Sequence, residues 1–204
     1  MINLAQLILD NTAESHSDPA GCPERMTRLH KFASEIIFEG DRIASIVRAL
    51  LSVSRQEEAG MVLATPAELV ESVHSLVSKL FVKEDITIDF IIDCDAPPVS
   101  CIPAQIRQVL LNLLTNARDA IEGSENHDPR TSRITLHACN HEDGRQWLRI
   151  SVSDTGEGMD DSIIQHIYEP FFSTKERGKG TGLGLSVSRE IIEKHHGRIS
   201  FESL

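Results

Sequence analysis

The sequence predicts an α+β protein in which a helical hairpin precedes a domain with one sheet covered by helices on one face. Two interleaved heptad series run through residues 24–55, a pattern typical of a helix in a coiled coil or bundle. From Thr65 onward, helical and strand patterns alternate, and two adjacent strand patterns are joined by a short turn. We therefore expect a hairpin over residues 1–58 and a second domain over residues 59–204.

The hairpin prediction starts with a short apolar stretch at residues 2–10 and a polar loop at residues 11–23. A helix over residues 24–55 would be about 48 Å long at ~1.5 Å per residue. That length exceeds a small domain, so we expect this helix to pack against the first helix and against a second copy of the chain. The alternative is a long helix folded onto its own domain.

The second domain begins with a helix-start pattern, in which Thr65 caps the helix, Pro66 is its first residue and Glu68 completes a capping box. The later pattern predicts a strand at 86–90, a helix at 103–121, strands at 134–139 and 148–152 around a turn at Asp143-Gly144, a short helix at 160–168, a helix at 185–195 and a strand at 199–201.

Composition excludes several classes of protein. The chain has 204 residues, is 40% hydrophobic and 25% charged, and is therefore unlike a disordered protein. Its net charge of −11 argues against a general binder of nucleic acid. No apolar run approaches the ~20 residues that cross a bilayer, and the start has no signal-peptide pattern. The four cysteines form no CxxC pair and fit a reducing compartment, so we expect a cytoplasmic location.

The helix at 103–121 carries a polar stripe without Lys or Arg. Its members are spaced to share one face: Gln105, Gln108, Asn112, Asn116 and Asp119. Amide and carboxylate oxygens are hard ligands that suit Mg²⁺ held together with nucleotide phosphates. Taken alone, such a stripe is more often a solvated helix face.

Asp154 follows the strand at 148–152 on the face of its apolar residues, so we expect its carboxylate to point toward the helices and to be buried. Gly156 and Gly158 allow a tight turn and the close approach of a flat ligand. A carboxylate there can accept a hydrogen bond from an adenine amino group, although a plain turn explains most such strings.

Glycines recur at alternate positions from Gly178 to Gly184 and lead into the helix at 185–195. Backbone N–H groups and a helix N-terminus attract anions, and Lys175 and Lys179 add positive charge. The spacing matches neither the Rossmann fingerprint nor the P-loop. We interpret the run as a phosphate-binding loop; the alternative is a flexible linker.

Together these segments resemble the bacterial sensor histidine kinases. Residues 112–120 are similar to the asparagine box of that family, 154–158 to the first glycine box, 169–175 to the phenylalanine box and 180–185 to the second glycine box. Residues 42–55 resemble the end of the dimerising hairpin. The resemblance implies a two-layer α/β sandwich that binds ATP, preceded by an antiparallel helical hairpin that dimerises into a four-helix bundle.

The resemblance also implies residue roles. Asn116, with Asn112, would hold Mg²⁺; Asp154 would bind adenine; and Gly156 and Gly158 would shape the base pocket. The remaining implied ATP-binding residues are Asp119, Phe172, Lys175, Lys179, Gly180, Thr181, Gly182, Leu183 and Gly184. The γ-phosphoryl group of ATP would pass to a histidine, and then to an aspartate of a response-regulator receiver domain.

The acceptor-histidine box of the family is absent from residues 1–58. We expect the acceptor to lie before Met1, and His30 is the candidate within the chain. Two other functions remain open. A hydrolytic clamp of the wider superfamily would need a Glu four residues before Asn116, where this sequence has Asn112. A dimeric, non-enzymatic ATP-binding module would have the same motifs.

Overall fold

The computed structural model describes Lys31, Phe32, Ile36 and residues 60–81, 84–124, 128, 130–175 and 180–203. The chain divides into two compact units, one of residues 1–56 with 173–181 and one of residues 57–172 with 182–204. The predicted hairpin at 1–58, its dimerisation and His30 lie outside the described residues, apart from the three isolated positions named above. All the helices and strands below belong to the second unit.

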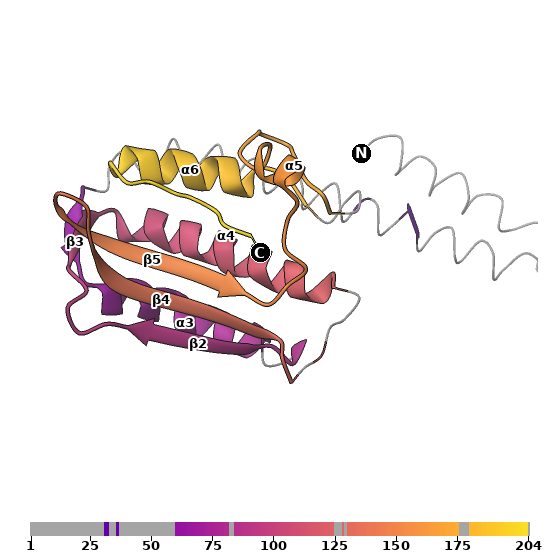
Figure 1. Cartoon of the computed structure of the whole chain (residues 1–204), viewed down its shortest axis with the longest axis horizontal. Helices are drawn as coiled ribbons and strands as arrows, with labels where there is room; N and C mark the ends of the chain where they lie inside the picture. Colours follow the sequence, from indigo (N-terminus) through magenta and orange to yellow (C-terminus); the bar gives the residue numbers. More distant parts are fainter. Residues whose placement is uncertain are drawn as a thin grey trace, which may run out of the picture. The chain divides into compact units, whose positions relative to one another are not determined.

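The second unit contains five strands and four helices among its described residues (Figure 1). In chain order they are β1 (Val62–Ala64), α3 (Pro66–Phe81), β2 (Thr87–Ile92), β3 (Val99–Cys101), α4 (Pro103–Glu122), β4 (Arg133–Glu142), β5 (Gln146–Asp154), α5 (Asp161–Ile164) and α6 (Gly184–Lys194). This mixture confirms the predicted α+β class.

The start of α3 is the capping box that the sequence predicts. The Glu68 carboxylate accepts hydrogen bonds from the Thr65 backbone N–H at 2.8 Å and from the Thr65 hydroxyl at 2.9 Å. The Glu68 backbone N–H donates in return to the Thr65 hydroxyl at 3.3 Å. These bonds hold the pKa of Glu68 below its ordinary value, with the Thr65 backbone N–H as the largest cause.

The main sheet has the order β2-β4-β5. β2 and β4 are parallel, with Phe90 opposite Leu136, and β4 and β5 are antiparallel, with Ala138 opposite Ile150. The predicted turn between β4 and β5 is confirmed, and Gly144 adopts a φ of +67° there. β1 and β3 form a separate antiparallel pair, so the prediction of a single sheet was wrong.

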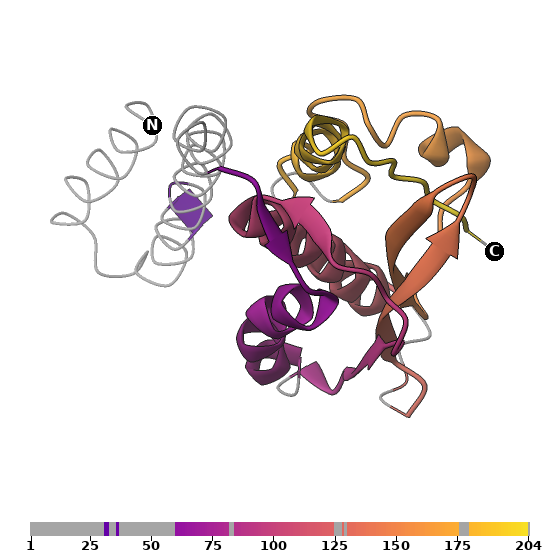
Figure 2. The same cartoon turned by 90° about the vertical axis from the view of Figure 1, so that its left-hand side faces the viewer.

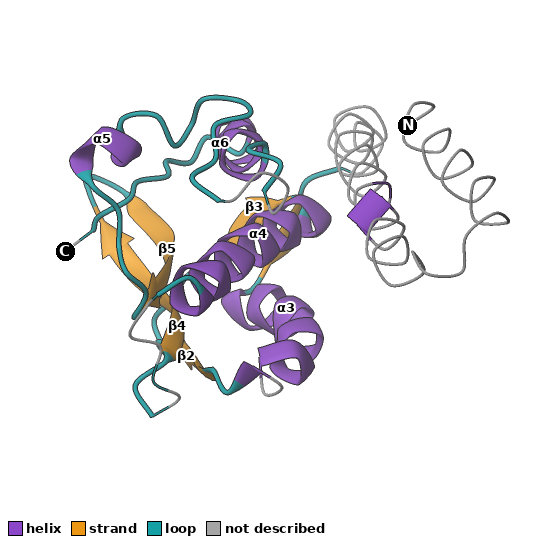
Figure 3. Cartoon of the chain, turned by 90° about the vertical axis from the view of Figure 1, so that its right-hand side faces the viewer, coloured by secondary structure: helices purple, strands orange, loops and turns teal. Residues whose placement is uncertain are grey.

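The helices form a layer on one face of the main sheet (Figures 2 and 3). α3 and α4 pack on the sheet and on each other, and α6 packs on α4. Leu114 of α4 and the β4 residues Ile134, Leu136 and Ala138 are fully buried between the layers. Their alternation along β4 leaves the intervening side chains on the opposite face of the sheet.

His195 joins the end of α6 to the start of α4. Its Nε2 accepts a 3.0 Å hydrogen bond from the Ile102 backbone N–H, and its Nδ1 lies 2.8 Å from the Ile191 carbonyl oxygen. These two partners assign the proton to Nδ1. The histidine thereby satisfies a backbone donor at the N-cap of α4, where no side-chain cap is formed.

Two predicted elements differ from the structure. The helix expected at 160–168 covers only Asp161–Ile164, and turns follow it at residues 165–168. Residues 199–201 do not form the expected strand. The Tyr168 hydroxyl donates to the Ile199 carbonyl of this segment at 3.0 Å, and after the segment the Met159 backbone N–H donates to the Ser203 hydroxyl at 2.7 Å.

Candidate functional site

The polar stripe of α4 faces other helices as well as solvent. Gln105 is buried, and Asn112, Asn116 and Asp119 are half-buried. The Asn112 amide nitrogen donates a 3.0 Å hydrogen bond to the hydroxyl of Ser188 on α6. At Asn112 the stripe is therefore part of the contact between α4 and α6. It is not merely a solvated helix face.

The first residue of α6 also lies against Asn112. A Cβ atom added to Gly184 would lie 2.1 Å from the Asn112 side-chain oxygen, far inside van der Waals contact. A side chain at this position would force the Asn112 amide to move, so a glycine lets the N-terminus of α6 approach Asn112 this closely. The structure thus brings the asparagine-rich segment and the glycine-rich segment together, although 76 residues separate Asn112 from Ser188.

Asp119 has a partner that the sequence analysis did not assign. The adjacent Arg118 guanidinium lies 2.6 Å from its carboxylate, and Glu84 lies 3.8 Å from the same guanidinium. Burial lowers the pKa of Arg118, but the hydrogen bond and charge of Asp119, together with the Glu84 charge, outweigh this effect and raise it. The Arg118 guanidinium is therefore paired with Asp119, the last residue of the stripe.

Asp154 ends β5 as predicted, but it is exposed, so the expectation of burial was wrong. Its Oδ1 accepts a 2.8 Å hydrogen bond from the Gly156 backbone N–H. This bond gives the carboxylate a backbone partner, because the chain turns back on it immediately after the strand ends.

Gly156 packs directly on the last turns of α4. A Cβ atom there would lie 2.7 Å from the Cβ of Ala120. Asn116 lies one helical turn before Ala120 and therefore on the same face of α4. The loop after β5 and the asparagine stripe consequently meet at this end of the helix. Gly158, two residues further on, adopts a φ of +76° that favours glycine.

Gly182 pairs with Phe171 in the backbone. The Phe171 N–H donates to the Gly182 carbonyl at 2.9 Å, and both residues have positive φ values, +69° and +64°. A Cβ on Gly182 would lie 2.3 Å from the Phe171 carbonyl carbon. The phenylalanine-containing segment and the glycine-rich segment are thus joined through the backbones of these two residues. Phe172 lies beside His166, with 5.7 Å between ring centroids.

The remaining predicted ligands belong to the segment 173–181, which lies in the first unit. Within it, the Lys175 backbone N–H donates to the Ser173 hydroxyl at 3.3 Å, and Gly180 packs against the same hydroxyl. Thr181 is half-buried, as is Leu183 just after the segment, whereas Lys179 and Gly178 lie outside the described residues.

The sequence analysis missed Ser188, which is 2% exposed and the hydrogen-bond partner of Asn112. Its position offers a signal in retrospect. Ser188 lies four residues after Gly184 and therefore on the same face of α6. A small residue and a hydroxyl at that spacing indicate the face that packs closely on another helix.

Comparisons with known proteins show the family of the chain. Residues 101–204 match the family described as histidine kinase-, DNA gyrase B- and HSP90-like ATPase. The sensory histidine kinase/phosphatase NtrB of Proteus hauseri is 35% identical over 94% of this chain and 51% of its own length. The two-component sensor PprA of Pseudomonas aeruginosa is 40% identical over 53% of this chain. The chain spans 12% of PprA and about half of NtrB.

Solved structures of histidine kinases are also similar to this chain. The catalytic domain of histidine kinase ThkA is similar with a TM-score of 0.53 and 32% identity, over 66% of this chain and 81% of that one. ThkA in complex with the response regulator protein TrrA is similar with a TM-score of 0.63 and 25% identity, over 96% of this chain and 52% of that one.

Proposed function

Because this chain belongs to the family of histidine kinase-, DNA gyrase B- and HSP90-like ATPases, we propose that it is the ATP-binding part of a sensor histidine kinase in a two-component system. It binds Mg-ATP and passes the γ-phosphoryl group to a histidine, from which an aspartate of a response regulator takes it. The relatives named sensor kinases support this reading over a hydrolytic clamp.

One observation carries the proposal. Asn112, Gly184 and Ser188 bring the asparagine stripe of α4 against the N-terminus of α6. Backbone N–H groups at a helix N-terminus attract phosphate oxygens, and amide oxygens beside them suit a hard cation. The groups that would form a Mg-nucleotide site are therefore adjacent, which supports the proposal, and positioning and charge neutralisation supply most of the catalysis in phosphoryl transfer.

Asn116 is the first proposed Mg²⁺ ligand, because an amide oxygen suits a hard cation. Asn112 remains the second proposed ligand, although its amide nitrogen already binds Ser188 and its oxygen faces Gly184. Mg²⁺ held there would supply positive charge that neutralises the nucleotide phosphates. Asp154, held by the Gly156 N–H, is the proposed acceptor for the adenine amino group.

Several finer assignments belong to the same proposal. The lid over the nucleotide would include Phe172, Lys175, Lys179, Gly180 and Thr181, and the phosphates would lie against Gly182, Leu183 and Gly184. The partners would be a response-regulator receiver domain and a second copy of the chain, joined through residues 1–58 in the cytoplasm. Among the described residues, none of the helices is long and apolar enough to cross a membrane.

The decisive experiment supplies the acceptor separately. The chain is incubated with γ-labelled ATP, Mg²⁺ and a hairpin that carries an acceptor histidine. We expect label on the hairpin that survives base but not acid, as phosphohistidine does, and no label with the Asp154→Asn variant.

Two other outcomes are informative. Label on the chain itself would place an acceptor within these residues, and His30 would be mutated first. Nucleotide binding without any labelled hairpin would favour the non-enzymatic module and contradict the proposal.

A further inference from the structure

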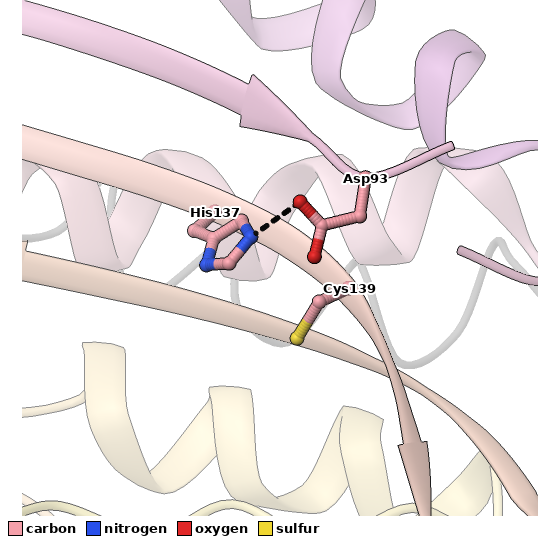
Figure 4. Close-up of side chains that lie close together, drawn as sticks. All are labelled: Asp93, His137 and Cys139. Atoms are coloured by element: carbon pink, nitrogen blue, oxygen red, sulfur yellow. Dashed lines mark hydrogen bonds and ion pairs between the residues drawn. The ribbon is translucent and has the colours of Figure 1, made fainter. Parts of the chain in front are cut away.

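Three side chains with different donor atoms gather on the main sheet, away from the proposed nucleotide site. They are Asp93, His137 and Cys139 (Figure 4), and their ligand atoms all lie within 4.8 Å of one another. The His137 Nε2 lies 3.0 Å from the Asp93 Oδ1. Among the described residues, this is the one group of three or more His, Cys, Asp and Glu side chains with such spacing.

The backbone fixes this arrangement. His137 and Cys139 alternate on β4 around Ala138, which is fully buried against the helices. The two side chains therefore point to the opposite face of the sheet. Asp93 follows β2 directly, and its backbone N–H donates to the Ala138 carbonyl at 2.9 Å. This bond continues the parallel pairing of β2 and β4 by one residue and brings the carboxylate beside the other two groups.

We propose that Asp93, His137 and Cys139 bind a transition-metal ion of the zinc class. In a tetrahedral site with ligand distances of about 2.0–2.3 Å, donor atoms lie roughly 3.4 Å apart. The ligand atoms of the three side chains lie within 4.8 Å of one another, so small side-chain rotations would bring them to the distances of a tetrahedral site. Nitrogen and sulfur donors select zinc-like ions over Mg²⁺, and three protein ligands leave a fourth position for water.

Charge and access are consistent with this site. His137 and Asp93 have side-chain exposures of 36% and 41%, so an ion can reach them from solvent. Metal binding would deprotonate the Cys139 thiol, and the thiolate and carboxylate together would balance a divalent ion. Arg149 of β5 lies opposite Cys139 in the sheet. Its guanidinium lies 2.8 Å from the Nε2 atom of His141.

A bound ion would act on the edge of the sheet. β2 is an edge strand, and Asp93 is the first residue after it. Coordination would tie that end of β2 to β4 through side chains as well as through the backbone. The alternative is an ordinary ion pair between His137 and Asp93 beside an unrelated thiol. An ion pair needs no sulfur, so the role of Cys139 separates the two.

The test titrates the intact, reduced chain with Co²⁺ as a spectroscopic probe and then with Zn²⁺ as competitor. We expect a thiolate-to-cobalt charge-transfer band that Zn²⁺ abolishes. Cys139→Ser should remove the band, and His137→Gln and Asp93→Asn should each weaken zinc binding by at least the ~10-fold that loss of an outer partner causes in metal sites. Zinc should also raise the thermal midpoint of the unsubstituted chain, but not of Cys139→Ser.

Two neighbours provide matched controls. Cys94 is an exposed free cysteine next to Asp93, and His141 is on β4 two residues beyond Cys139. Cys94→Ser and His141→Gln should keep the band and the affinity. Absence of the band in the unsubstituted chain, or a band that persists in Cys139→Ser, would overturn the proposal. Circular dichroism of each variant separates loss of ligation from loss of fold.

Discussion

Asn112 of α4 is held between the hydroxyl of Ser188 and the backbone of Gly184, both on α6. A polar side chain in a helix contact limits how the two helices can be arranged, because its hydrogen bond has one favourable geometry. The N-terminus of α6 is thereby fixed against the asparagine stripe.

A double-mutant cycle measures that contact. Gly184→Ala should force the Asn112 amide away from Ser188 and lower the free energy of unfolding by about 1–2 kcal/mol, the cost of a broken part-buried hydrogen bond. In an Asn112→Ala background the same change should cost much less. Urea unfolding of the four proteins gives the coupling energy. Gly60→Ala, at a glycine with open space around it, is the control and should change little. An equal cost in both backgrounds would contradict the contact.

Gly182→Ala should be more damaging, because the clash is with the backbone of Phe171 and no rotamer relieves it. We expect the clash to lower the free energy of unfolding by about 1–3 kcal/mol in addition to the strain of a positive φ, and to weaken the affinity for ATP. Gly144→Ala is matched for conformation, since Gly144 also has a positive φ but no atom within 4 Å of an added Cβ. Both variants share the ~1–2 kcal/mol strain of a left-handed alanine, so the difference between them measures the clash. Equal destabilisation would mean that the Phe171–Gly182 pairing contributes nothing.

Asp154→Asn should abolish ATP binding in a calorimetric titration. The variant keeps an oxygen for the Gly156 N–H, so the loop should stay folded while the carboxylate is lost. Glu157→Gln removes a charge from an exposed residue of the same loop and should bind ATP normally. If Asp154→Asn bound ATP with unchanged affinity, the adenine assignment would be wrong.

Asn116→Ala should spare the binding of metal-free nucleotide and remove the part of the affinity that Mg²⁺ adds. The measurement compares ATP affinity in Mg²⁺ and in a chelator. Thr115→Ala is the control, because Thr115 is exposed and its hydroxyl bonds only back to the Leu111 carbonyl of its own helix. Equal losses with and without Mg²⁺ would count against a metal ligand at Asn116.

The capping box predicts a pH dependence of stability. The pKa of Glu68 is lowered in the fold, so its stabilising effect is complete above the ordinary value of 4.5 and is lost as the pH falls through the lowered pKa. Glu68→Gln should therefore be less stable than the unsubstituted chain at pH 7, and the two should converge in acid. Glu71→Gln removes a carboxylate from an exposed residue of the same helix, and it should change the free energy of unfolding little at either pH. A difference that persists in acid would assign the effect to something other than the carboxylate.

Local patterns predicted local structure well. The Thr65 and Glu68 capping box, the turn at Gly144 and the extent of α4 follow from neighbouring residues alone. The α4 stripe was located correctly because helical periodicity is a local property. The short strands β1 and β3 were missed, since three residues carry too little pattern to be distinguished from loop.

Long-range pairing was beyond the sequence. The parallel register of β2 and β4 and the bond between Asn112 and Ser188 depend on how α4 crosses the sheet, which no local pattern specifies. Asp154 was expected to be buried because the alternation of the apolar residues at 148–152 was extended to it, but it is the last residue of β5, where the chain turns onto Gly156. The site residues were therefore named largely by family resemblance, and their contacts came from the fold.

A backbone hydrogen bond joins Phe171 to Gly182, and both residues belong to the second unit. The segment 173–181 between them belongs to the first unit. The fold of that unit consequently does not depend on the number of residues between them. Lengthening such a segment costs only chain entropy, about 0.6 kcal/mol for each doubling. A reporter peptide or a small tag inserted there would leave α4, α6 and the sheet intact, and natural variation in length would be tolerated in the same place.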